Sequence, residues 1–212
     1  MLKAIDCTLC GAAVEYLTCF RDNKYYRCTN CLSVMMDPAG HLSSEVEKSR
    51  YDQHNNDVDD PGYRNFVKPL VEIVLNKYTP EARGLDYGAG PGPVAAVILK
   101  EKGFKIDLYD PYYWDNRELL DKKYDFIICC EVIEHFSKPA KEFRLLRSLL
   151  RPRGSLVCMT EIYNRDIDFE QWYYKNDPTH VFFYAPRALS WIKKEYDFTE
   201  LTVGKRLIHF ER

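Results

Sequence analysis

The sequence has no apolar run that approaches the roughly 18 residues a membrane-spanning helix needs, so we expect no membrane anchor. It has little net charge, because 30 Lys+Arg oppose 32 Asp+Glu, and a pI near 6.2 argues against a strongly basic nucleic-acid surface. The opening residues lack the charged-then-apolar order of a secretion signal, and neither internal repeats nor low-complexity tracts occur. With 46% hydrophobic and 29% charged residues, the chain is predicted to be globular and cytoplasmic.

Eight cysteines stand out in a chain expected in a reducing compartment, where clustered cysteines more often bind a metal than form disulfides. Four of them form two C-x2-C pairs, Cys7 with Cys10 and Cys28 with Cys31, and the segment 11–27 separates the pairs. This is a zinc-ribbon spacing, and Zn²⁺ in structural sites prefers four thiolates in a tetrahedron. We expect residues 1–38 to fold around a structural zinc ion that has no open position for catalysis.

The other four cysteines are predicted to have no part in this site. Cys19 is expected to be a bystander, because four ligands already complete the tetrahedron. Cys129, Cys130 and Cys158 lie in apolar runs and are predicted to be small core residues. The alternative interpretation of the two pairs is a coincidence of buried or redox-active thiols.

Residues 39–80 predict a helical connector. Ser44-x-x-Glu47 has the form of a capping box at the start of one helix. Further on, apolar residues recur at helical spacing around Pro69, which would stand near the start of a second helix or at a kink. A length of 212 residues accommodates the ribbon, this connector and one full-sized domain.

Residues 81–212 alternate between apolar strand patterns and amphipathic helix patterns. Such alternation predicts an α/β domain with a mostly parallel sheet and helices on both of its faces. The last two strands are separated only by a turn centred on Gly204, so we expect them to form an antiparallel hairpin.

A glycine-rich loop follows the first strand of this domain. An acid precedes three glycines at alternating positions, in the order Asp86, Gly88, Gly90 and Gly92. Glycines there let a ligand approach the backbone and keep the strand-to-helix turn tight. Pro91 and Pro93 remove two N–H groups that a phosphate cradle would use, so a ligand without phosphate is favoured. The alternative is a plain strand–helix turn.

The second strand ends in an acid. Asp110 closes the strand that follows the glycine loop and its helix, and a carboxylate at the carboxyl end of such a strand can accept both hydroxyls of a ribose. Pro111, Tyr112 and Tyr113 follow it and are expected to wall an adenine ring. The alternative for Asp110 is a helix cap or a solvated charge.

These motifs resemble those of the class I S-adenosylmethionine-dependent methyltransferases. The family's motif of an acid followed by G-x-G-x-G is matched by residues 86–92, its second acidic position by Asp110, and its fourth-strand motif by residues 130–136. The last motif is similar to that of a subgroup resembling ubiquinone-biosynthesis O-methyltransferases and sugar or small-molecule methyltransferases. The resemblance covers about residues 62–212. The ribbon resembles the N-terminal zinc-binding modules of some bacterial members.

The resemblance implies a Rossmann-like sheet and S-adenosyl-L-methionine as cofactor. The residues it implies for cofactor binding are Asp86, Tyr87, Gly88, Gly90, Gly92, Asp110, Pro111, Cys130 and Glu131, with His54 in a segment that covers the cofactor. Tyr51 and Tyr63 are further candidates for this cover, and a solvated connector is the alternative. The chain departs from the family pattern in the short segment 111–123 between Asp110 and Tyr124, where the family usually has a helix, a third strand and another helix. We therefore expect the sheet to be shortened around its third strand.

Two histidines are candidates for the general base of methyl transfer, which also requires alignment of the nucleophile with the S–CH3 bond. His135 follows the fourth strand at the mouth of the crevice, and its alternative role is to cap the next helix. His180 lies in an aromatic loop after the fifth strand, where the resemblance implies the acceptor pocket. Tyr173 and Tyr184 are expected to line that pocket, the alternative being that these rings pack beneath the C-terminal helix.

Three functions compete on the sequence alone. The first is methyl transfer to an O, N or C nucleophile of a small-molecule acceptor. The second is RNA methylation with the ribbon as an RNA-binding element, which the balanced charge and the few basic ribbon residues disfavour. The third is a non-catalytic zinc-ribbon binding module, which the intact loop at Asp86 and the acid at Asp110 disfavour.

Overall fold

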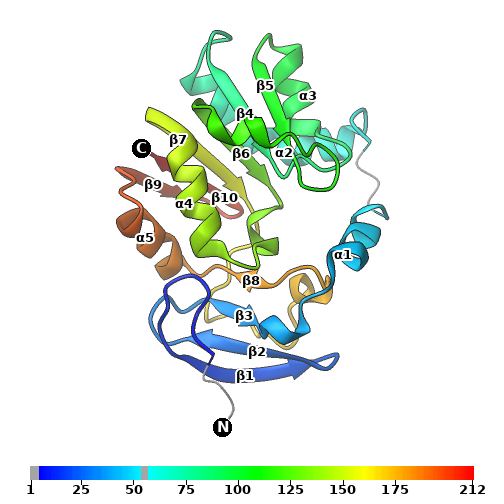
Figure 1. Cartoon of the computed structure of the whole chain (residues 1–212), viewed down its shortest axis with the longest axis vertical. Coiled ribbons are helices and arrows are strands. Elements are labelled where there is room, and N and C mark those ends of the chain that lie inside the picture. Colours follow the sequence, from blue (N-terminus) through cyan, green and yellow to red (C-terminus); the bar gives the residue numbers. More distant parts are fainter. Residues whose placement is uncertain (1–4, 54–56) are drawn as a thin grey trace.

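A computed structural model describes residues 5–53 and 57–212 and contains two sheets, of which the larger lies in the upper part of Figure 1 and the smaller at the bottom. The six strands of the larger sheet follow the order β5-β4-β6-β7-β10-β9. They are β4 (Arg83–Tyr87), β5 (Lys105–Tyr109), β6 (Tyr124–Cys130), β7 (Leu150–Met159), β9 (Glu200–Val203) and β10 (Leu207–Glu211). Strands β4 to β7 are parallel, and β10 runs antiparallel to β7 and β9. The predicted α/β class and terminal hairpin are confirmed.

Side chains that alternate along the central strands explain why helices cover both faces of this sheet. In β6, Ile127 and Cys129 pack into one core, while Phe126 and Ile128 pack into the other. The first core is covered by α4 (Pro139–Leu149) and α5 (Pro186–Glu195), and the second by α2 (Pro61–Lys77) and α3 (Val94–Glu101). Within the described ranges no helix is both long and apolar enough to cross a membrane.

The sheet ends at β5 on one side. Only a short 3-10 helix, η2 (Arg117–Asp121), lies between β5 and β6, and β5 has no further neighbour among the described strands. The expected shortening around the third strand is therefore confirmed. The segment from Pro111 to Lys123 is too short for a helix, a strand and a second helix.

The smaller sheet contains the cysteine pairs. Its strands are β1 (Val14–Phe20), β2 (Asn23–Cys28), β3 (Val34–Met36) and β8 (Phe182–Phe183), paired antiparallel in the order β1-β2-β3-β8. Arg21 and Asp22 form the turn between β1 and β2, and both adopt the left-handed backbone typical of such hairpins. The fourth strand comes from the aromatic loop, so the ribbon sheet joins segments far apart in the sequence.

The connector contains α1 (Ser44–Tyr51) and α2. The predicted capping box at Ser44 is wrong by one residue, because Ser43 is the N-cap and its hydroxyl accepts from the Val46 amide at 3.5 Å. Both serines can cap, but Ser43 is the one with extended backbone. Glu47 is then one residue too late to complete the box, and its carboxylate binds tyrosines instead.

Pro69 lies in the interior of α2 and not near its start. The helix begins at Pro61, after Asp60, whose carboxylate accepts from the Tyr63 amide at 2.5 Å. Proline at the first helical position and an aspartate cap before it are favourable, which explains why the helix starts earlier than its apolar pattern indicates.

Candidate active site

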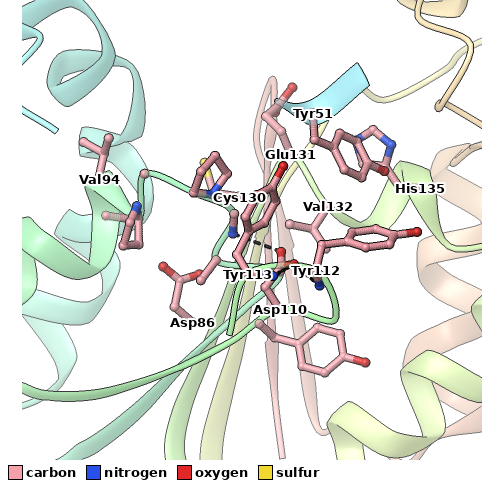
Figure 2. A pocket seen from close by; sticks show the side chains of 18 of the residues that line it. Tyr51, Asp86, Val94, Asp110, Tyr112, Tyr113, Cys130, Glu131, Val132 and His135 are labelled. Carbon is pink, nitrogen blue, oxygen red and sulfur yellow. Dashed lines mark hydrogen bonds between the residues drawn. The ribbon is translucent and has the colours of Figure 1, made fainter. Parts of the chain in front are cut away.

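A cavity of about 730 Å³ opens at the carboxyl ends of the parallel strands, where ligands bind in open α/β sheets. The predicted site residues that line it are Asp86, Tyr87, Gly88, Gly90, Gly92, Asp110, Pro111, Cys130, Glu131, His135 and His180. Figure 2 shows the carboxylates of Asp86, Asp110 and Glu131 around the same space, with Tyr51 and His135 at one side. The predicted His54 lies outside the described residues.

The glycine loop is held against the neighbouring strands by its own backbone. The amides of Gly88 and Ala89 donate to the Tyr109 carbonyl at 2.8 and 3.1 Å. Gly88 has φ +80°, and a Cβ on it would meet a methyl carbon of Val132 at 2.5 Å. Only glycine fits this position, because both the left-handed backbone and the contact exclude a side chain.

Asp110 organises the same loop from the end of β5. One carboxylate oxygen accepts from the Gly90 amide at 3.0 Å, and the other accepts from the amides of Tyr112 and Tyr113 at 2.8 and 3.2 Å. A carboxylate has about four acceptor positions, so these three bonds leave capacity for a ligand hydroxyl. The indole of Trp114 donates to the Gly90 carbonyl at 2.7 Å and completes the link between the two loops.

Asp86 is almost fully buried at the end of β4. Burial raises the pKa of its carboxyl to about 7, and the negative charge of nearby Asp110 adds to this increase. A cationic ligand group beside Asp86 would stabilise the ionised carboxylate and reverse part of the shift.

Helix α1 is tied across the cavity to the loop after β5. Glu47 accepts hydrogen bonds from the hydroxyls of Tyr51 and Tyr112 at 2.7 and 2.6 Å, and Asp52 accepts from Tyr113 at 2.7 Å. These contacts place the connector over the part of the cavity that Asp110 faces. Tyr63 also lines the cavity, at the start of α2.

In the opposite half of the cavity Tyr174 contacts two glutamates, half-buried Glu131, which lines the cavity, and Glu134 behind it. Glu134 is fully buried, and Glu131 follows β6 with a left-handed backbone, φ +53°. The Tyr174 hydroxyl contacts Glu134 and lies 3.2 Å from Glu131, while Thr160 lies 3.0 Å from the same hydroxyl. A phenol has only one proton to donate, so a second proton on one of the carboxyls is needed to satisfy both contacts.

The pKa values of the two glutamates agree with a retained proton. Burial raises the pKa of Glu131 to about 8, with a contribution from the charge of Glu134. Burial likewise raises the pKa of Glu134 to about 7, against the hydrogen bond from Tyr174. One oxygen of each carboxyl is buried without a hydrogen-bond partner among the described residues.

Arg206 supplies positive charge to this half from the turn between β9 and β10. Its guanidinium lies 2.5 Å from Glu131, contacts Glu161 and lies 3.2 Å from the Tyr173 hydroxyl. The sequence interpretation missed this residue because nothing in its immediate neighbourhood marks it. The topology of the sheet could have located it: β10 runs antiparallel to β7, so the residues at its start lie at the carboxyl edge of the parallel strands.

The two predicted histidines lie together beside the glutamates. The His135 and His180 ring centres are 4.8 Å apart. Nδ1 of His135 lies 2.9 Å from the Thr179 carbonyl, and Nδ1 of His180 lies 2.6 Å from the Tyr174 carbonyl. A carbonyl only accepts, so each Nδ1 carries a proton, and Nε2 is the basic nitrogen of each neutral ring. Burial lowers the pKa of His135, which favours its neutral form.

The aromatic residues predicted for the acceptor pocket divide into two groups. Tyr173 lines the cavity and is 59% exposed. Tyr184 does not line it, because its ring is fully buried and its hydroxyl donates to the Ile133 carbonyl at 3.0 Å. Alternation along β8 and the residues after it turns Tyr184 into the core, where its ring packs against Phe143 of α4, whereas the packing alternative placed it beneath the C-terminal helix.

The four paired cysteines converge in the N-terminal ribbon. Their sulfurs all lie within 4.8 Å of one another, with 3.7 Å between Cys7 and Cys31 and 3.3 Å between Cys10 and Cys28. A tetrahedron with Zn–S bonds of about 2.3 Å has edges of about 3.8 Å. The amide of Cys31 also points at the Cys28 sulfur at 3.3 Å, and Gly11 takes a left-handed backbone after the first pair. The donor set fits a tetrahedral zinc ion.

Comparison with known sequences identifies the family. A profile of the methyltransferase domain matches residues 34–203. The ubiquinone biosynthesis O-methyltransferase of Histophilus somni is 32% identical over 81 residues, 36% of this chain and 34% of that protein. That of Photobacterium profundum is 30% identical over 80 residues, 38% of this chain and 34% of that protein. The match thus spans about a third of the length of these curated relatives.

Solved structures share the fold. A SAM-dependent methyltransferase from Archaeoglobus fulgidus has a TM-score of 0.56 at 17% identity, over 70% of this chain and 94% of that one. Magnesium protoporphyrin IX methyltransferase from Synechocystis, solved with S-adenosylhomocysteine, has a TM-score of 0.54 at 17% identity, over 80% and 94%. The chain belongs to the methyltransferase-domain family, and its fold is that of the class I S-adenosylmethionine-dependent methyltransferases, as its motifs predicted.

Proposed function

We propose that this protein transfers a methyl group from S-adenosylmethionine to an O, N or C nucleophile of a small-molecule acceptor. The observation that carries the proposal is a single cavity with two different halves. One half, the cofactor half, contains the glycine loop and Asp110, which have the donors and acceptors that an adenosine and a methionine tail require. The other half, the acceptor half, contains Glu131 and the histidine pair, which have proton-accepting groups, and Glu134 is buried behind them.

The chemistry needs the acceptor to lie in line with the sulfonium methyl and to lose a proton when it is a hydroxyl or a protonated amine. In this proposal His180 or His135 takes that proton through its basic Nε2, since Nδ1 of each ring is held by a carbonyl. Tyr174 and Arg206 hold the glutamates, and α1 excludes water from the cofactor half.

The direct test of this function is product formation. Incubation with S-adenosylmethionine and a panel of phenols, sugars and amines should release S-adenosylhomocysteine with at least one acceptor, and His180→Ala should slow the reaction about 100-fold or more. Arg165→Ala, at an exposed position outside the cavity, is the control and should leave the rate unchanged. Turnover that needs structured RNA instead would favour the RNA-methylation alternative.

Binding of S-adenosylmethionine should tighten as pH rises. The ionised Asp86 carboxylate attracts the cationic cofactor, and a pKa of about 7 means it is mostly protonated at pH 6 and mostly ionised at pH 8. Calorimetry across that range should show affinity rising by roughly tenfold, with proton release near neutral pH. Asp86→Asn should flatten the dependence, and a wild-type affinity that does not change with pH would contradict this role.

The cluster of Glu134, His135 and His180 also has the donor set of a divalent cation site. One ligand atom of each lies within 4.8 Å of the others, and Glu134 has a buried oxygen without a partner among the described residues. A cation there would lower the pKa of an acceptor hydroxyl and remove the need for a histidine base. Loss of turnover in EDTA, restored by Mg²⁺, Mn²⁺ or Zn²⁺, would support this second arrangement, and full turnover in EDTA would exclude it.

We propose further that Cys7, Cys10, Cys28 and Cys31 hold a structural zinc ion. Metal analysis of the purified protein should give one zinc per chain, and Cys10→Ser should reduce it to well below one. Cys19→Ser is the matched control, because Cys19 is exposed and stands outside the cluster. Zinc far below one equivalent in the wild type would exclude the site.

A further inference from the structure

The ribbon sheet and the acceptor half of the cavity share a strand. β8 pairs with β3 through Val34–Phe183 and Met35–Phe182, and β8 directly follows His180 and Val181. The last strand of the ribbon sheet is therefore the continuation of the loop that contains one of the two candidate bases.

Hydrogen bonds extend this link to the glutamates. The Met36 amide donates to the Val181 carbonyl at 2.9 Å, and the Val181 amide donates to the Glu134 carbonyl at 2.9 Å. His135, the next residue along, bonds the carbonyl of Thr179 in the same loop. Val181 is thus held from the ribbon on one side and from the end of β6 on the other.

The path from the cysteine cluster to β3 is short. Cys31 stands three residues before Val34, and the Cys28 amide donates to the Ser33 carbonyl at 2.9 Å. The fully buried Ser33 hydroxyl accepts from the Ala185 amide, just after β8, at 3.1 Å. A metal that fixes the second cysteine pair would therefore fix the end of the β3–β8 pairing where Val34 lies opposite Phe183.

Packing supports the same connection. Cys7, Cys28 and Cys31 belong to the hydrophobic core that also contains Phe182 and Tyr184. Three further bonds join the ribbon to the aromatic loop: Arg27 donates to the Tyr163 hydroxyl at 2.9 Å, Thr18 donates to Glu170 at 2.8 Å, and Arg21 donates to the Asn176 carbonyl at 3.4 Å.

The cofactor half has no comparable link to the ribbon. Within the described residues, no hydrogen bond joins β1, β2 or β3 to the glycine loop or to the segment 105–114. Those loops are held by each other and by α1. Among the described residues, hydrogen bonds from β1, β2 and β3 therefore reach the acceptor half of the cavity and not the cofactor half.

We infer that metal binding at the four cysteines is what positions the acceptor half of the active site, while the cofactor half forms without it. This inference rests on the proposed function. Metal loss would release β8 from β3, and the loop from Tyr174 to Tyr184 would lose its fixed position. His180 and His135 would then no longer be aligned with the cofactor.

Hydrogen exchange on the full chain tests the inference. In Cys10→Ser, or in wild type treated with a zinc chelator, amides of residues 174–184 should exchange at least tenfold faster, while those of 84–92 and α3 should change less than threefold. The affinity for S-adenosylmethionine should stay within about threefold of wild type. Cys19→Ser, with the metal retained, should exchange like wild type throughout.

Ser33→Ala provides a second variant that leaves every metal ligand in place. It removes the bond to the Ala185 amide, so exchange should rise in 181–185 while zinc content stays at one per chain. Unchanged protection of 174–184 in the metal-free protein, a wild type without bound metal, or loss of α3 protection together with 174–184 would each overturn the inference. If wild type fails to bind S-adenosylmethionine, the proposed function fails, but the exchange result still decides whether the ribbon holds this loop.

Discussion

Asp110→Ala should lower the affinity for S-adenosylmethionine by about 100-fold or more. In the proposed complex the Asp110 carboxylate accepts a ribose hydroxyl, and a hydrogen bond to a charged group contributes roughly 1.5–3 kcal/mol. The variant also removes the acceptor for the amides of Gly90, Tyr112 and Tyr113, so the loops that contact adenosine lose their common anchor. Isothermal calorimetry measures the change directly.

Two variants separate these contributions. Asp110→Asn retains one amide oxygen for the backbone donors but loses the charge, so its affinity should fall between those of Asp110→Ala and wild type. Asp107→Ala changes another acid on β5 that does not line the cavity, and it should bind the cofactor normally. Equal affinity of Asp110→Ala and wild type would contradict the assignment of this residue to the ribose.

Arg206→Ala should destabilise the protein by about 2–3 kcal/mol at pH 8, which corresponds to a Tm lower by roughly 5–10 °C for a chain of this size. The change removes the cation that contacts Glu131 and Glu161, and less than a quarter of the surface of each of these side chains is exposed. A buried carboxylate without its partner must then either remain charged in a poor solvent or take up a proton.

The effect of Arg206→Ala should shrink as pH falls. The pKa of Glu131 is raised to about 8 in the folded protein, above that of an unfolded glutamate, so the folded state binds the extra proton. Stability linked to this group is therefore fully present below the unfolded pKa and is lost as pH rises toward 8. At pH 5.5 Glu131 is neutral and gains little from the charge of Arg206. The Tm difference between Arg206→Ala and wild type should therefore be smaller than at pH 8.

Lys205→Ala is the matched control for this experiment, because Lys205 is exposed in the same turn. Thermal unfolding at pH 5.5 and pH 8 should show little change for it at either pH. A destabilisation by Arg206→Ala that is equal at both pH values would mean that the guanidinium acts through packing on Phe66 and Tyr174 and not through the carboxylates.

The sequence predicted the elements that depend on local pattern. Alternation and apolar spacing placed the strands and helices of the larger sheet, and the short interval before Tyr124 predicted the missing strand at its edge. The order of Asp86, the glycines and Asp110 predicted that these residues would surround one cavity, because carboxyl ends of parallel strands meet at one edge.

What the sequence did not predict depends on contacts between distant segments. The pairing of Phe182 and Phe183 with the ribbon joins residues about 150 positions apart, and a two-residue strand has no pattern of its own. Arg206 reaches the cavity through the register of β10 on β7, which local residue types do not encode. The sequence also did not distinguish fully buried Glu134 from half-buried Glu131. The two have the same residue type and lie three positions apart, and only the tertiary contacts make their environments different.

A crystal structure with S-adenosylhomocysteine tests the central claim most directly. It should show the ribose on Asp110, the adenine beside Tyr112 and Tyr113, and the sulfur facing the space bounded by Glu131 and His180. A ligand bound elsewhere, or a cavity that stays without ligand at saturating concentration, would contradict the account of this protein as a methyltransferase with a divided site.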